Sequence, residues 1–323
     1  MTLFNGIYPF YPQERKPFVF DVSLIIIIVV FLVFAVSFLL ILPGIRGRAR
    51  LYWLFRVIIS LFIGGVIVAV NFTSDWERGQ VRANTTYKSF SSALVHVDVG
   101  LKVGLSGVNI TLLGNPVEQL NETINYNEYF PWLFGNDYNL QYDKGLRQGL
   151  PHPILYVAEK FSTYNPCDLN SFYRIAGHYA SATLWVAFCA WLVSNMLFSM
   201  PVPVYGGYMM LITGAFLIFA LLSFSTVRSA PTCVIQFGDA SLRPVYGASF
   251  WLTLVAGLLC FLIGGMVITL HYARPSLLNA FFDLCEDEDE DEDKVLSEIY
   301  VNPRFPPEHD VASQPNLRLS VKS

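Results

Sequence analysis

The sequence has few charged residues and contains no motif that marks a catalytic site. Asp, Glu, Lys and Arg make up 14% of its 323 residues, whereas soluble domains carry about a quarter. Apolar residues reach 54% and the mean hydropathy is +0.45. Glycine-rich dinucleotide fingerprints and P-loops are absent, and the cations form no basic stripe. This composition excludes an ordinary soluble domain and argues against a nucleic-acid partner.

Polar and ionisable side chains are sparse inside the long apolar runs as well. A transmembrane haem enzyme needs facing histidines within its helices, and none of the five histidines lies at the centre of a run: His96, His152, His178, His271 and His309. Arg56 is the one charge inside a run, and internal repeats are absent, so transport is not favoured. Asn195 is expected to make a hydrogen bond between helices. We expect no catalytic residue, cofactor, metal site or small-molecule substrate.

Five apolar runs dominate the chain. A helix needs roughly 20 apolar residues to cross a hydrocarbon core of about 30 Å. These runs have that length and lack the polar face of a helix that packs on a soluble core. They predict five transmembrane helices at 22–42, 51–70, 179–200, 208–227 and 246–270.

The distribution of positive charge predicts the orientation. Arg15 and Lys16 precede the first run, and Arg46, Arg48 and Arg50 follow it. Loops rich in Lys and Arg stay in the cytosol, so the N-terminus is expected outside and the C-terminus in the cytosol. Residues 71–178 would then form a large outer loop, and the chain would contact the lipid bilayer through its helices.

Glycosylation sequons support this orientation. Asn-x-Ser/Thr occurs at Asn71, Asn84, Asn109 and Asn121, all within the predicted outer loop. Asn71 directly follows the second apolar run and is too close to the membrane for modification. We expect glycans on Asn84, Asn109 and Asn121.

The outer loop carries a strand pattern. Every odd position from 95 to 105 is apolar, Gly107 permits a turn, and the alternation resumes over 108–112. Period-2 alternation indicates strands with one buried face, so a β-hairpin is predicted, with Asn109 on its polar face. Residues 155–161 resemble a short helix. The loop is therefore expected to be a compact α+β domain.

The cysteines divide by compartment. Cys167 and Cys233 are the two that fall in the predicted outer loops, where disulfides form. An internal bridge between them would contribute about 4 kcal/mol in the chain-entropy model. The alternative is that one or both bond to a partner chain.

The chain thus divides into an outer N-terminal segment, two helices with a cytosolic hairpin, the outer domain, three helices with a second outer loop, and a cytosolic tail, at 1–21, 22–70, 71–178, 179–272 and 273–323. The tail contains an acidic run over 286–293 and is expected to be disordered. A solvated tail is the simpler interpretation of that run, and contact with a basic cytosolic surface is the other.

Several stretches resemble the dual oxidase maturation factors. They are LPGIRGR at 42–48, SLFIG at 60–64, GVNITL at 107–112, QLNETINYNE at 119–128, LYVAEKF at 155–161 and AGHYASATLWVAF at 176–188. The resemblance extends from about residue 1 to about residue 280. No family motif is evident in the acidic tail.

This resemblance implies a non-catalytic partner of a dual oxidase, the NADPH-driven enzyme that releases hydrogen peroxide outside the cell. It implies that the chain accompanies the oxidase from the endoplasmic reticulum to the plasma membrane and remains as a subunit. It also implies five spans with a claudin-like α+β extracellular domain in the first outer loop. The alternative is a claudin-like adhesion or scaffold protein without an oxidase partner.

Overall fold

The structure is a computed structural model that describes residues 22–41, 49–88, 92–132, 137–163, 169–200, 203–229, 234–238 and 240–273. The predicted N-terminal segment, most of the hairpin after the first helix, and the acidic run all lie outside the described residues.

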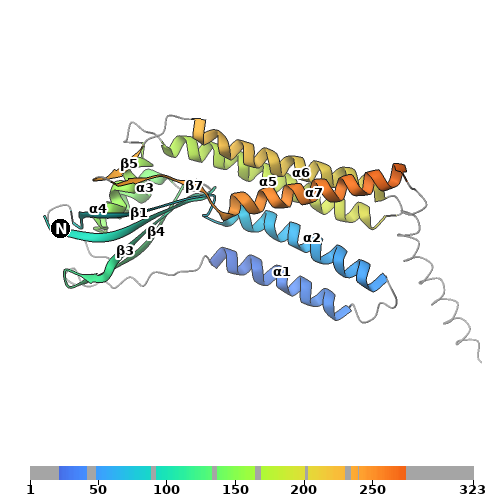
Figure 1. Cartoon of the computed structure of the whole chain (residues 1–323), viewed down its shortest axis with the longest axis horizontal. Coiled ribbons are helices and arrows are strands. Elements are labelled where there is room, and N and C mark those ends of the chain that lie inside the picture. Colours follow the sequence, from blue (N-terminus) through green and yellow to red (C-terminus); the bar gives the residue numbers. More distant parts are fainter. Residues whose placement is uncertain are drawn as a thin grey trace, which may run out of the picture. The chain divides into compact units, whose positions relative to one another are not determined.

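Within the described residues, five helices are long and apolar enough to cross a membrane, as the apolar runs predict. They are α1 (Val22–Ile41), α2 (Ala49–Phe72), α5 (Leu169–Phe198), α6 (Pro203–Ser225) and α7 (Ala248–Ala273). Helix α5 begins at Leu169, ahead of the apolar run, and Tyr173 in its first turns donates a hydrogen bond to Glu77 of the sheet domain. Figure 1 shows these helices extending to one side of the sheet.

Helices α5, α6 and α7 pack as neighbours, and α2 contacts α5 and α7. Close approach between α6 and α7 depends on glycine: a Cβ added to Gly264 would lie 2.8 Å from the carbonyl oxygen of Gly207. Helix α1 packs on α2, where the Phe31 ring lies against Gly65. Most of the other apolar side chains of α1 are exposed, as expected of a helix surrounded by lipid.

A five-stranded antiparallel sheet lies at one end of the helices, in the order β4-β3-β2-β1-β7. Its strands are β1 (Glu77–Thr86), β2 (Leu94–Val103), β3 (Gly107–Gln119), β4 (Glu122–Pro131) and β7 (Val245–Tyr246). The predicted hairpin is confirmed as β2 and β3, which pair from Val103 with Val108 outward. Strands β1 and β4 were not predicted.

The segment before α7 is more structured than the predicted loop. A short hairpin of β5 (Ile235–Phe237) and β6 (Ala240–Leu242) packs beside β1, and β7 then pairs with the start of β1. The sheet is therefore built from two segments far apart in the sequence.

The apolar face of the sheet forms the core of this domain. Val95, Val97 and Val99 of β2 are fully buried. Two helices cover this face: α3 (Tyr138–Arg147) packs on β4, and α4 (His152–Lys160) packs on β3 and β1. Helix α4 confirms the short helix predicted near residues 155–161, and it buries Ile154 and Val157.

Candidate functional site

The opposite face of the sheet is polar. The strand register pairs Arg78 with Lys102, Arg82 with Asp98 and Asn84 with His96, while the alternate residues point into the core. We define the polar face as the outward side chains of β1 and β2 together with their neighbour on β3: Arg78, Gln80, Arg82, Asn84, His96, Asp98, Lys102 and Asn109. Its charged members are Arg78, Arg82, Asp98 and Lys102.

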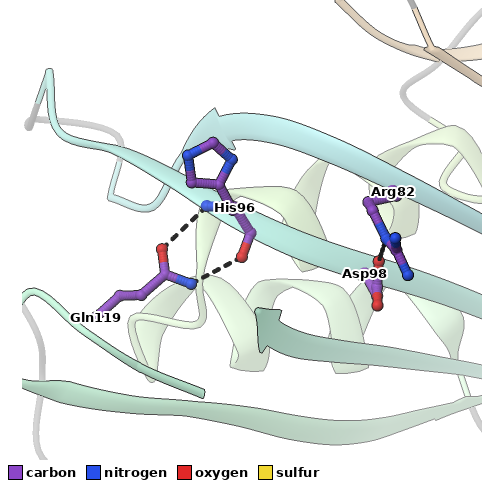
Figure 2. Close-up of polar contacts among 4 residues, drawn as sticks. All are labelled: Arg82, His96, Asp98 and Gln119. Carbon is purple, nitrogen blue, oxygen red and sulfur yellow. Dashed lines mark hydrogen bonds and ion pairs between the residues drawn. The ribbon is translucent and has the colours of Figure 1, made fainter. Parts of the chain in front are cut away.

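Two polar contacts organise this face (Figure 2). Arg82 Nε donates to Asp98 Oδ1 at 2.8 Å. The side-chain amide of Gln119 pairs with the backbone of His96 in the way that a neighbouring strand would. Its Nε2 donates to His96 O at 2.8 Å, and its Oε1 accepts from His96 N at 3.0 Å. This continues the β2–β3 pairing beyond Gly114, where the backbone register ends.

The Arg82–Asp98 pair is exposed and stabilises the fold little. The Arg82 side chain is 76% exposed and Asp98 is 16% exposed. The hydrogen bond to Asp98, and then its charge, raise the pKa of the Arg82 guanidinium. Exposed ion pairs contribute little because water and salt screen them. Side chains on the polar face can therefore bind a partner without weakening the core of the sheet domain.

The predicted glycosylation residues occupy two places on the sheet. Asn84 is exposed on the polar face, and Asn109 is half-buried beside Lys102. Asn121 is exposed in the turn between β3 and β4, where its φ is 58°, a conformation that Asn tolerates better than most residues. Asn71 is buried and accepts a hydrogen bond from Ser181 Oγ at 2.8 Å.

The two predicted outer-loop cysteines, Cys167 and Cys233, both lie outside the described residues. Cys189 in α5 and Cys260 in α7 are free thiols. Among the described residues, no group of three His, Cys, Asp or Glu side chains is placed to hold a metal ion.

A second feature, not predicted from the sequence, is the connection between sheet and helices. Asp75 lies between α2 and β1 and binds the start of α7: its Oδ2 accepts from Ala248 N at 3.2 Å, and its carbonyl oxygen accepts from Ser249 N at 3.1 Å. The hydroxyls of Thr73 and Ser249 are 2.7 Å apart. An acidic side chain at a helix N-terminus is favourable because the exposed amides there carry partial positive charge.

Trp76 fills the centre of this connection. Its side chain is fully buried, and its Nε1 donates to Val70 O at 2.7 Å. The indole ring packs on Phe224 of α6, with centroids 5.0 Å apart, and on Phe250 of α7. Gly247 N donates to Trp76 O at 2.8 Å. One residue thus ties β1 to three helices.

Glu77, the first residue of β1, is also buried. It is 1% exposed and accepts a hydrogen bond from Tyr173 Oη at 2.6 Å. A buried carboxylate requires such partners because burial removes its hydration. Tyr173 lies in the first turns of α5, which explains why this helix extends beyond its apolar run.

Aromatic packing extends the connection toward α4. The Tyr173 ring packs on Trp132 and on Phe161, with centroids 6.3 and 5.8 Å apart. Trp132 Nε1 donates to Leu105 O at 3.0 Å. Burial raises the pKa of the nearby Tyr138 phenol well above its usual value, and its hydroxyl donates to Ala158 O at 2.8 Å. We define the junction as Thr73, Asp75, Trp76, Glu77, Trp132, Tyr173, Phe224, Ser249 and Phe250.

Fold and site together define a class: a multi-pass membrane protein whose sheet domain is joined to its helices by a buried, hydrogen-bonded junction. The model of the dual oxidase maturation factor family matches residues 10–286. The chain belongs to this family.

Relatives within the family are similar over most of their length. Mouse dual oxidase maturation factor 2 is 52% identical over 321 residues, which cover 99% of each chain. Human dual oxidase maturation factor 2 is 54% identical over 283 residues, or 88% of each chain. Human dual oxidase maturation factor 1 is 52% identical over 290 residues, or 90% of this chain and 84% of the relative.

Proposed function

We propose that this chain is a non-catalytic membrane subunit of a dual oxidase, required for exit of the oxidase from the endoplasmic reticulum, its delivery to the plasma membrane and its production of hydrogen peroxide. The observation that carries the proposal is the junction, which fixes an exposed polar face relative to the membrane helices. The family names support the choice of partner. The oxidase would perform the redox chemistry.

The proposed orientation places the sheet domain outside the cytosol. The N-terminal segment 1–21 and the claudin-like domain within 71–178 would face outward, and the tail 273–323 would face the cytosol. The positive charges of the hairpin between α1 and α2 support this arrangement. Glycans on the exposed Asn84 and Asn121 fit the same orientation.

The junction suggests how such a subunit acts. Association is weakened by the entropy lost when mobile groups are immobilised, so a surface held in one pose before binding loses less. Here Trp76 and Glu77 are buried between the sheet and the helices, which limits motion of the polar face. Charged side chains on that face would steer and select the oxidase, while the helices pack beside those of the oxidase in the bilayer.

Co-expression tests the proposal. A dual oxidase expressed with this chain should reach the cell surface and release peroxide at levels about tenfold or more above those of the oxidase alone, since trafficking would depend on assembly. The readouts are surface biotinylation of the oxidase and extracellular peroxide. Unchanged surface oxidase with each dual oxidase tested would contradict the proposal and favour the adhesion or scaffold alternative.

Electrophoresis of the protein expressed alone tests the proposed modifications. Removal of each sequon by Asn→Gln at Asn84, Asn109 and Asn121 should produce a stepwise increase in mobility, and glycosidase treatment should abolish the differences. If Cys167 and Cys233 pair internally, non-reducing gels should show a monomer that migrates faster than the reduced protein. A thiol-dependent larger species would instead indicate a bond to another chain.

A further inference from the structure

Arg56 lies near the end of α2 that is remote from the sheet, at a level where α5 ends. Its guanidinium carbon lies 4.7 Å from the centroid of the Trp53 ring and 5.9 Å from that of Phe198. Its Nη2 donates to Ser199 Oγ at 3.2 Å. Cation–π contacts and a hydrogen bond therefore hold this guanidinium in a defined position.

A chain of hydrogen bonds beneath Arg56 fixes α2 against α5. Ser199 Oγ donates to Asn195 O at 3.2 Å, Asn195 Nδ2 donates to Trp191 O at 2.8 Å, and Ser60 Oγ donates to Asn195 Oδ1 at 2.5 Å. The interhelical bond expected of Asn195 is thus confirmed. These serine and asparagine side chains are neutral and hydrogen-bonded within the two helices, so they do not balance the charge of Arg56.

Among the described residues, the positive charge of Arg56 is incompletely neutralised. Within the part of the chain that the structure describes, no carboxylate forms an ion pair with it. The nearby C-terminus of α5 offers only about half a negative charge. A guanidinium has five N–H donors in a fork that matches phosphate or carboxylate, and the structure assigns one hydrogen bond to it. The remaining donors can bind an anion.

Aromatic residues at the same end of the helices indicate the level of the lipid headgroups. Tyr205 is 62% exposed, and the hydroxyls of Tyr208 and Tyr272 are 3.2 Å apart. Tyr and Trp gather where the hydrocarbon meets the headgroups, and an arginine side chain extends toward that level. Lipid phosphates are the anions that the membrane itself supplies at that level.

We propose that Arg56, Trp53 and Ser199 form a binding site for the phosphate of an anionic phospholipid in the leaflet opposite the sheet. The guanidinium binds the phosphate oxygens through its fork, and the two aromatic rings hold it in place. Naming this leaflet as cytosolic rests on the proposed orientation, and the cytosolic leaflet is the one rich in anionic lipid. The site itself does not depend on the oxidase.

Lipid retention by the full-length protein tests this site. The protein is placed in nanodiscs of mixed phosphatidylcholine and phosphatidylserine, and its bound lipids are determined by native mass spectrometry. Arg56→Gln should lower the retained phosphatidylserine about tenfold, as expected for loss of a charge-assisted interaction. Arg56→Lys should be intermediate, because it keeps the charge without the fork. Arg174→Gln, the same change at an exposed residue near the sheet, should have no effect.

Three results would overturn the proposal. The first is equal phosphatidylserine retention by the wild type and Arg56→Gln. The second is equal protection from thermal unfolding by inorganic phosphate and by short-chain phosphatidylserine, which would indicate a free-anion site. The third is an effect of Arg56→Gln that appears only in complex with the oxidase, which would indicate a partner carboxylate.

If Arg56→Gln does not fold, Ser199→Ala replaces it as the test variant. It retains the charge and should lower retention about two- to threefold, since one neutral hydrogen bond is lost. Unchanged retention in Ser199→Ala would then contradict the site. All lipid measurements use the protein without oxidase, so they remain valid if the proposed function fails.

Discussion

Trp76→Ala should destabilise the sheet domain by about 3–5 kcal/mol, the usual cost of truncating a fully buried aromatic side chain. The substitution removes the ring from between Phe224 and Phe250 and leaves Val70 O without the indole donor. Hydrogen exchange of the β1 and β2 amides in the full-length protein measures the effect. Protection there should fall by roughly two to four orders of magnitude.

Trp251→Ala is the matched control for this change. Trp251 is the same residue type in α7, but the residue is 55% exposed on the surface of the helices. Substitutions at such positions usually alter stability by about 0.5 kcal/mol or less. Similar losses of protection in the two variants would show that the junction contributes no special stability.

A second large change in stability is expected from substitution of one of two adjacent glycines in α7. Gly264→Ala should destabilise the helices by about 1–3 kcal/mol, the cost of overpacking, because its Cβ would lie 2.8 Å from Gly207 O and 2.9 Å from a Leu211 methyl carbon. Gly265→Ala should be neutral or stabilise by up to about 1 kcal/mol, since nothing lies within 4 Å of its added Cβ. Detergent-induced unfolding of the purified protein compares the two variants.

The test depends on the sign of the stability change in each of these two variants. Both variants add the same methyl group to the same helix, so differences in intrinsic helix propensity cancel. Equal destabilisation by the two variants would indicate that α7 packs on α6 through a different face. Stabilisation by Gly264→Ala would contradict the close approach of Gly207 and Gly264 directly.

The apolar pattern predicted the parts of the fold that local sequence determines. Five apolar runs became five helices, and most of the alternation over 95–105 became β2, which ends at Val103. Strand β1 was missed because its inward side chains include the small Gly79 and Ala83 and its other face is strongly polar. Strand β7 has only two residues and pairs with a strand distant in the sequence, so no local pattern reveals it.

The junction was not predictable from local patterns for a related reason. Asp75 and Trp76 are ordinary residues in a short connection, and their role becomes visible only when α7, far along the chain, lies beside them. Tyr173 likewise precedes the apolar run of α5 and gains a role through Glu77. Glycosylation, the pairing of Cys167 with Cys233, and the role of the acidic tail remain predictions.

We propose that the junction holds the sheet domain in the pose that a dual oxidase requires. The most direct measurement is surface oxidase and peroxide release in cells that co-express the oxidase with Trp76→Ala or Trp251→Ala at equal membrane abundance. The expected result is a loss of about tenfold or more with Trp76→Ala and wild-type levels with Trp251→Ala. Wild-type surface delivery with a Trp76→Ala variant whose β1 and β2 amides have lost protection would contradict it.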